Sequence, residues 1–377
     1  MKSINFSKHV LPHVVAILVF LITTVAFFNP IFFDNKSLDQ HDIKQWKGGA
    51  QEMIDYREKT GEEGLWTNSM FGGMPAYLIN VQWNDGFISA FKSVLSIFLP
   101  HPIKNIFLAF ISFYILLLVF KVRPYIAIAG ALVFGLSTYM IIGLGAGHNS
   151  RIGAVAFMPL VMAGIHLAFD RNKLLGVALT ALALALELRE NHLQITYYLL
   201  LIVIFYGAIV FYEALKNKTL ADFGKTLSLL ILAAVLGLGT FIGKIWTTYE
   251  YGKYSIRGKS ELTQKQSSGE KTGLSKDYAF QYSNDTWGPM TMIVPNFLGG
   301  GFGTYFVQEE DSETLKALQR AGDQQAANQL ARYSSSFWGE KPPAPYYIGA
   351  IVFFLFVLSL FFIEKKYIIW LSSVSVL

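Results

Sequence analysis

The sequence predicts an all-α polytopic membrane protein, and composition supplies the main observations. Of 377 residues, 53% are hydrophobic and only 15% are charged, with a mean hydropathy of +0.40. A typical soluble domain has about 25% charged residues. The 31 Phe and 19 Tyr agree with this class, because aromatic side chains collect where helices leave the hydrocarbon. Collagen-like, disordered and disulfide-rich proteins are excluded.

Several kinds of chemistry are excluded as well. The chain has no cysteine, so thiolate metal sites, iron–sulfur clusters and a cysteine nucleophile are ruled out. Walker, HExxH and GxSxG motifs do not occur in the sequence. The net charge of +5 says little by itself, since the placement of Lys and Arg matters more in a membrane protein. No nucleic-acid partner is expected.

Apolar runs give the expected spans, because a hydrocarbon core of about 30 Å needs about 20 apolar residues in a helix. The expected spans are residues 11–33, 103–120, 125–144, 152–169, 174–188, 193–215, 226–245 and 346–363. A ninth run starts at Tyr367 and stops at Leu377, too short to cross. We therefore expect the chain to be the N-terminal part of a longer protein.

Basic residues orient these spans, since Lys and Arg stay in cytoplasmic loops. The basic groups are Lys2 and Lys8; Lys121 and Arg123; Arg171 and Lys173; Lys216, Lys218 and Lys225; Lys365 and Lys366. All fall on one side if every run crosses once. The large loops 34–102 and 246–345 then lie on the extracytoplasmic side, together with the turns 145–151 and 189–192.

The first outer loop carries candidate catalytic residues. Residues 38–59 are expected to form an amphipathic helix along the membrane surface, capped by Ser37 or Asp39. Asp39 and Asp42 stand at its start, where a carboxylate can act as a general base. The Asp-x-His-Asp pattern can instead hold a divalent cation. A solvated charge or a helix cap is the alternative for each carboxylate.

The two short outer turns add polar residues at the same side. His148 and Arg151 suit a phosphate group, although Arg151 can also extend to lipid headgroups while His148 caps a helix. The fifth span, 174–188, is too short for the hydrocarbon, which places Arg189, Glu190 and His192 at or below the interface. Ionisable groups at that depth need a partner or a watery cavity. We expect a shared cavity; an Arg189–glutamate ion pair between helices is the alternative.

Six segments together resemble the YfhO-type family of bacterial membrane proteins. Three of them are Gln40-His41-Asp42-Ile43-Lys44-Gln45-Trp46, Gly147-His148-Asn149-Ser150-Arg151 and Tyr254-Ser255-Ile256-Arg257-Gly258; the others are residues 66–77, 191–198 and 345–350. The resemblance covers essentially the whole chain. It implies a GT-C-like multi-helix bundle with two large extracytoplasmic loops, because this family is similar to the GT-C glycosyltransferases. Family members are typically much longer.

The resemblance also implies site residues. GT-C enzymes use an acidic residue of the first outer loop, and that position falls on Asp42, with Asp39 second. This sequence has Asp-x-x-Asp where the pattern has an adjacent acidic pair, so the base and any metal remain open. The expected substrate-binding residues are His148, Arg151, Arg189, Glu190, His192 and Arg257.

The function implied is an inverting glycosyltransferase of the bacterial cytoplasmic membrane with its active site on the outer face. It would move a sugar from a polyprenyl-phosphate carrier to a cell-envelope glycan or lipid-linked acceptor, among membrane lipids. Two alternatives remain. A transporter or flippase of lipid-linked sugars would have its site near the bilayer midplane. A non-catalytic assembly factor for envelope polymers would need no base.

Overall fold

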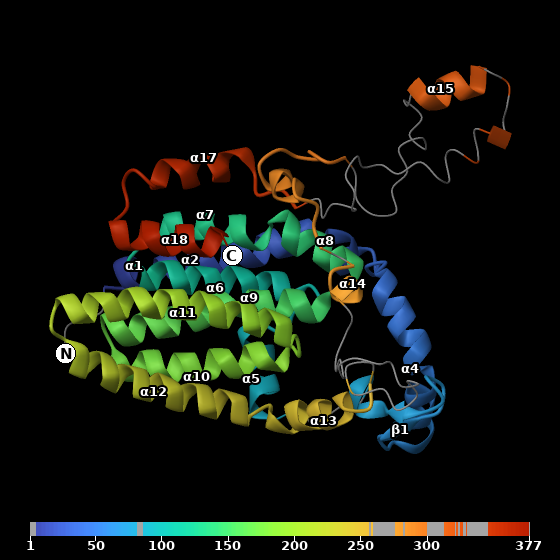
Figure 1. Cartoon of the computed structure of the whole chain (residues 1–377), viewed down its shortest axis with the longest axis horizontal. Coiled ribbons are helices and arrows are strands. Elements are labelled where there is room, and N and C mark those ends of the chain that lie inside the picture. Colours follow the sequence, from blue (N-terminus) through green and yellow to red (C-terminus); the bar gives the residue numbers. More distant parts are fainter. Residues whose placement is uncertain are drawn as a thin grey trace, which may run out of the picture. The chain divides into compact units, whose positions relative to one another are not determined.

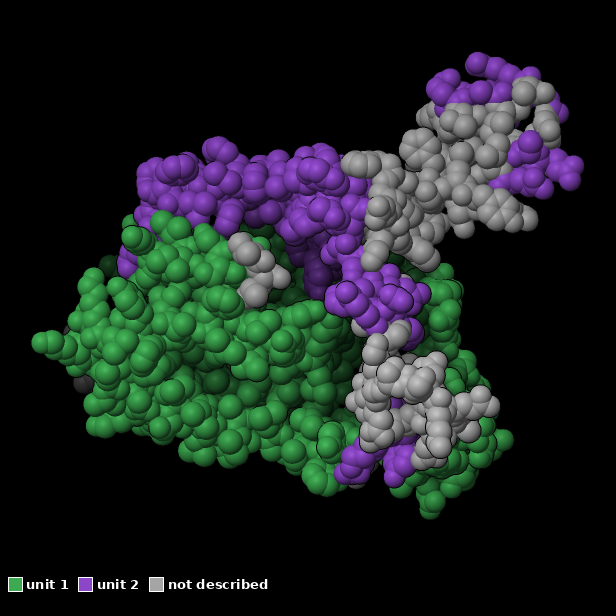
Figure 2. Space-filling view, viewed as in Figure 1, with its two compact units in different colours: residues 1–136, 140–249, 365–377 green, residues 137–139, 250–364 purple. Residues whose placement is uncertain are grey.

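A computed structural model describes residues 5–80, 86–255, 276–281, 283–299, 313–320 and 346–376, together with residues 258, 322, 325, 326 and 329. These residues are predominantly helical. They form two compact units, which Figure 2 colours separately. Unit 1 comprises residues 1–136, 140–249 and 365–377, and unit 2 comprises residues 137–139 and 250–364.

Most helices belong to unit 1. They are α1 (Phe6–His9), α2 (Leu11–Phe27), α3 (Asn29–Phe33), α4 (His41–Thr60), α5 (Phe87–Leu95), α6 (Lys104–Val119), α7 (Pro124–Gly135), α8 (Thr138–Ala146), α9 (Asn149–Asp170), α10 (Lys173–Arg189), α11 (Leu193–Lys216), α12 (Leu220–Gly239), α13 (Ile242–Gly252) and α18 (Lys365–Val376). The first residues of α8 and the last residues of α13 fall in unit 2. Unit 1 also holds an antiparallel pair of short strands, β1 (Trp66–Thr67) and β2 (Met74–Pro75), followed by the 3₁₀ helix η1 (Ala76–Leu78).

Unit 2 contains shorter described elements. They are α14 (Lys276–Ala279), η2 (Gly288–Met292), α15 (Glu313–Arg320) and α17 (Ala350–Ser359). Within this unit Thr138 Oγ1 donates a hydrogen bond to the Tyr347 carbonyl oxygen at 2.9 Å, which ties the start of α8 to the chain before α17.

Among the described residues, four helical stretches are long and apolar enough to cross a membrane. They are Pro124–Ala146, which combines α7 and α8, and the helices α9, α11 and α12. The apolar helices α2, α6 and α17 are shorter, at 17, 16 and 10 residues. The described chain is therefore mostly helical and has apolar helices long enough to span a membrane, which agrees with the class that the composition predicts. Eight crossings and their orientation remain predictions.

Two local expectations differ from the structure. The expected first span is interrupted at Phe28, because Pro30 at the start of α3 has no backbone N–H to continue the ladder of α2. The expected cap on the loop helix is wrong: α4 begins after Gln40, and its first turn has no side-chain cap. Asp39 pairs with Lys44 instead.

Helix α9 is the centre of unit 1. Its span is 83% buried within the chain, whereas the other three stretches are 17% to 28% buried. It packs most closely with α10 and α6, and Figure 1 shows these helices running alongside α11 and α12. Lipid can therefore cover the outer helices while α9 stays inside the protein. The buried α9 holds the side chains at its ends in fixed positions.

Small residues bring α9 and α10 into close contact. A Cβ added at Gly164 would lie 2.5 Å from Thr180 Oγ1, and one at Gly176 would lie 2.2 Å from the Ala168 backbone nitrogen. Such contacts leave no room for a larger side chain, and close backbone approach is the main attraction between helices in lipid. The two helices are antiparallel, so this face continues to the other end of the pair.

We predict that Gly176→Ala lowers the free energy of unfolding by about 1–3 kcal/mol, the usual cost of overpacking a tight contact. The loss should appear although Ala favours helices over Gly by about 1 kcal/mol. Thermal unfolding in detergent measures it. Gly207→Ala in α11 is the matched control, because a Cβ there meets nothing within 4 Å. Equal stability of the two variants would contradict the close contact.

Candidate active site

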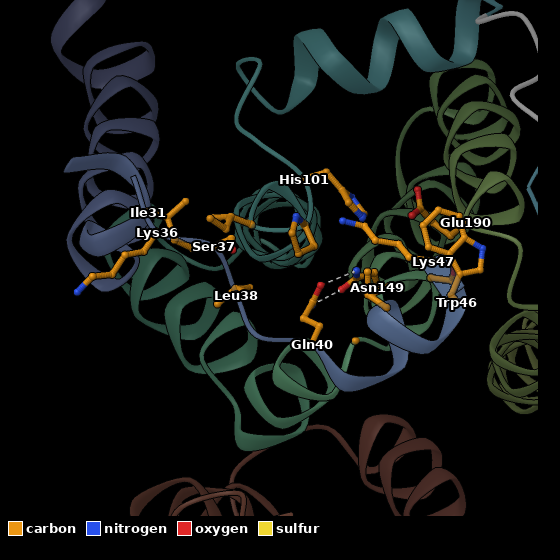
Figure 3. A pocket seen from close by; sticks show the side chains of 15 residues that line it. Ile31, Lys36, Ser37, Leu38, Gln40, Trp46, Lys47, His101, Asn149 and Glu190 are labelled. Carbon is orange, nitrogen blue, oxygen red and sulfur yellow. Dashed lines mark hydrogen bonds between the residues drawn. The ribbon is translucent and has the colours of Figure 1, made fainter. Parts of the chain in front are cut away.

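A cavity of about 660 Å³ opens in unit 1. Its walls come from the segment after α3, the start of α4, the loop before α6, the turn between α8 and α9, and the end of α10. Figure 3 shows Gln40 and Asn149 in its middle, with Trp46, Lys47 and Glu190 to one side and Ile31, Lys36 and Ser37 to the other. Parts of the chain far apart in the sequence therefore share one cavity.

A reciprocal pair of amides fixes the start of α4 against the start of α9. Gln40 Nε2 donates to Asn149 Oδ1 at 2.9 Å and to the Leu144 carbonyl oxygen at 2.6 Å, while Asn149 Nδ2 donates to Gln40 Oε1 at 3.2 Å. Both side chains are buried. Asn105 of α6 donates to the Asn149 carbonyl oxygen at 3.1 Å. Buried amides need such partners, so this network holds the cavity floor in one arrangement.

Gly147 permits this docking. Its φ of +97° is a conformation that side chains disfavour. A Cβ at this position would also lie 3.2 to 3.3 Å from side-chain atoms of Gln40, Asp42 and Ile43. A larger residue would therefore push the first turn of α4 away from the turn before α9.

The same contact brings Asp42 to His148. Asp42 Oδ2 lies 2.9 Å from His148 Nε2, and both side chains are about half exposed. Burial and the charge of Arg151 lower the pKa of His148, and Asp42 offsets this only in part. His148 is therefore neutral near pH 7, and its Nε2–H donates to the Asp42 carboxylate. Their sequence neighbours Gln40, Ile43, Gly147 and Asn149 line the cavity.

Two further predicted residues lie close to this pair. Arg151 acts electrostatically on both His148 and His192. Burial and the charge of Arg151 lower the pKa of His192. The His192 Nδ1 atom is buried and has no hydrogen-bond partner among the described residues. Asp42, His148, Arg151 and His192 thus form one cluster beside the cavity.

Glu190 lines the cavity and has a partner that the sequence analysis did not identify. Lys92 Nζ of α5 lies 2.5 Å from Glu190 Oε1, and the two side chains are only 13% and 7% exposed. Gly153 leaves space for the carboxylate, because a Cβ there would lie 2.0 Å from Glu190 Oε2. Lys92 is the only charged residue of α5, which is the signal that sequence reasoning missed. Arg189 is half-buried and is not part of the cavity wall.

The remaining predicted residues stand apart from the cluster. Asp39 Oδ1 lies 2.5 Å from Lys44 Nζ, and both side chains are largely exposed. His41 hydrogen-bonds Gln45 at 2.9 Å. Among the described residues no group of three His, Asp or Glu side chains has the arrangement of a metal site. Arg257 lies outside the described residues.

The sequence analysis also did not identify the aromatic and basic residues of the cavity wall. Trp46 Nε1 donates to the Ile79 carbonyl oxygen at 3.1 Å, which holds the indole ring in place. His101 lies at the rim, where burial and the charges of Lys92 and Lys104 lower its pKa to about 4. His101 is therefore neutral near pH 7.

Comparisons of the chain with family models, curated proteins and solved structures found no match.

We predict that Lys92→Met lowers the free energy of unfolding by about 3–5 kcal/mol, because it leaves the Glu190 carboxylate buried without its partner. The double variant Lys92→Met/Glu190→Gln should recover most of that loss. Thermal unfolding in detergent measures both effects.

The control is Lys173→Met, which breaks a pair with the largely exposed Asp222 at 2.6 Å. Exposed ion pairs contribute at most about 1 kcal/mol. A Lys92→Met variant no less stable than this control would show that the buried ion pair does not form.

Proposed function

We propose that the protein is a membrane glycosyltransferase that moves a sugar from a polyprenyl-phosphate carrier to a cell-envelope glycan or lipid-linked acceptor on the outer face of the cytoplasmic membrane. The observation that carries the proposal is the Asp42–His148 pair, 2.9 Å apart, beside a cavity of about 660 Å³ with apolar and basic walls. The resemblance to the YfhO-type family supports the same reading.

Asp42 is the general base of this mechanism. Its carboxylate takes the proton of the acceptor hydroxyl as that oxygen forms a bond to the anomeric carbon of the donor. The bond from that carbon to the carrier phosphate breaks at the same time, so the phosphate leaves with the bonding electrons. A single displacement of this kind inverts the anomeric centre. Neutral His148 donates a hydrogen bond from Nε2–H to the Asp42 carboxylate. This hydrogen bond orients the carboxylate toward the acceptor hydroxyl.

Basic groups beside the cavity suit the departing phosphate. Arg151 lies near His148 and His192, and a guanidinium binds phosphate oxygens in a bidentate manner. A positive charge aimed at the leaving oxygen stabilises the charge that develops in the transition state. Arg189, His192 and Arg257 remain proposed contributors to substrate binding.

The position of the cluster favours transfer over transport. Asp42, His148 and Arg151 stand at the N-terminal end of α9, and Glu190 follows the C-terminal end of α10. Transporter sites typically lie near the bilayer midplane, on interrupted helices. Charges gathered at one end of two long helices suit chemistry on substrates that arrive from the membrane surface.

We predict that Asp42→Asn reduces sugar transfer by about 10²- to 10⁴-fold, because Asn keeps the size of the side chain but cannot accept the proton. The assay incubates purified protein with a panel of polyprenyl-phosphate hexoses and envelope membranes, and measures sugar incorporation.

Asp39→Asn is the matched control, since Asp39 pairs with exposed Lys44. It should transfer sugar at close to the wild-type rate. Full activity of Asp42→Asn would refute the mechanism, and full activity of both variants would favour a transporter or an assembly factor. A large loss only in Asp39→Asn would move the base to that residue.

A further inference from the structure

A second cavity, of about 140 Å³, lies at the end of α9 that is opposite to the candidate active site. The last turns of α9, the C-terminal half of α11 and the first turns of α18 enclose it, and all three belong to unit 1. The groups of the proposed transfer reaction stand at the other end of α9, so this cavity has a separate role.

His166 of α9 and Tyr206 of α11 leave one hydrogen without an acceptor. Both side chains line the cavity and are more than nine-tenths buried. His166 Nδ1 lies 2.5 Å from the Tyr206 hydroxyl oxygen. A neutral imidazole has one N–H and a phenol has one O–H, and only one of these two hydrogens occupies the bond between them. Either the His166 Nε2–H or the Tyr206 O–H therefore has no acceptor among the residues that the structure describes.

Trp370 of α18 brings a second buried donor to the same cavity. Its Nε1 atom is buried and has no hydrogen-bond partner among the described residues. The indole ring lies against Tyr206, with 5.2 Å between the ring centres. A buried donor is costly when it lacks an acceptor. Two such donors at one cavity indicate a bound group that supplies acceptor oxygens.

The ion pairs around the cavity carry a net positive charge. Asp170 Oδ2 lies 3.0 Å from Lys121 Nζ and 3.2 Å from Arg171 Nε. Glu213 Oε1 lies 3.5 Å from Lys366 Nζ. Both carboxylates are thus engaged by cations, and the three cations of these pairs exceed the two carboxylates by one charge. A negatively charged acceptor fits this cavity better than a neutral one.

The size and the neighbours of the cavity indicate what carries this charge. The cavity is smaller than the usual site for a whole small molecule, about 300–1,000 Å³, so it takes one polar head and leaves the rest of the ligand outside. Phe211 and Leu215 of α11 and Ile369 of α18 are exposed apolar neighbours of its lining residues. In the orientation predicted from Lys and Arg, this end faces the cytoplasmic leaflet, whose anionic lipids attract basic groups.

We propose that this cavity binds the phosphate of an anionic phospholipid, with Trp370 Nε1 and the His166–Tyr206 pair as hydrogen-bond donors beside the Lys366 ammonium. The acyl chains of the lipid lie along the apolar side chains of α11 and α18. Such a lipid ties α18 to α9 and α11. The inference goes beyond the proposed function and does not depend on it, because no residue of this cavity takes part in sugar transfer.

Native mass spectrometry of the full chain, purified in detergent and freed of lipid, tests this assignment. The probes are dioctanoyl phosphatidylglycerol, dioctanoyl phosphatidylcholine and inorganic phosphate. Phosphatidylglycerol should bind about 10-fold more tightly than the other two, since phosphatidylcholine has no net charge and inorganic phosphate has no acyl chains. Trp370→Phe keeps an aromatic ring but loses the N–H, and it should weaken phosphatidylglycerol binding about 10-fold.

Trp246→Phe is the matched control. Trp246 is exposed on α13 and does not line this cavity, so its variant should bind like the wild type. Equal phosphatidylglycerol affinity of the Trp370→Phe and Trp246→Phe variants would overturn the inference. Inorganic phosphate that binds as tightly as phosphatidylglycerol would overturn it as well, because the site would then take a free anion.

A second pair of variants decides the question even if Trp370→Phe does not fold. Lys366→Gln brings the charge of the ion pairs from +1 to zero, so it should remove most of the preference for phosphatidylglycerol over phosphatidylcholine. Lys366→Arg should keep that preference. An unchanged preference in Lys366→Gln would contradict the proposed site.

Discussion

The close contact between α9 and α10 is the constraint on which the candidate site depends. Gly164 faces Thr180 and Gly176 faces Ala168, and the same face ends at Gly153, where Glu190 lies against α9. Because the helices are antiparallel and their backbones touch, the residue after α10 cannot move without moving the first turns of α9. The turn that holds Glu190 and His192 is therefore fixed relative to His148 and Arg151.

The segment that leads into α4 packs against this fixed end of α9. Gln40 and Asn149 form two hydrogen bonds with each other, and Gly147 allows α4 to approach the turn before α9. Asp42 reaches His148 as a consequence. Charged groups at this end are mostly paired: Glu190 with Lys92 and Asp42 with His148.

Local rules account for what the sequence could predict. Composition and apolar run length identified a helical membrane protein, and the short apolar run 174–188 pointed to charges near Glu190. Sequence reasoning could not pair Gln40 with Asn149, which are 109 residues apart, because no local pattern encodes that contact. Sequence reasoning missed Lys92 for the same reason. The role of a lone lysine in an apolar helix can be recognised only when the structure shows that it pairs with Glu190. The predicted cap of α4 was wrong because Asp39 pairs with the side chain of Lys44 and does not accept a hydrogen bond from the backbone of the first turn.

The most direct test of this account is a double-mutant cycle between Asp42 and His148 on the rate of sugar transfer. In the proposed mechanism His148 acts only through the carboxylate that it orients, so the two residues work as one unit. Asp42→Asn/His148→Gln should then be no more impaired than Asp42→Asn alone, and His148→Gln alone should lose activity in part. A double variant whose loss equals the product of the two single losses would contradict the account, because the two side chains would then act independently.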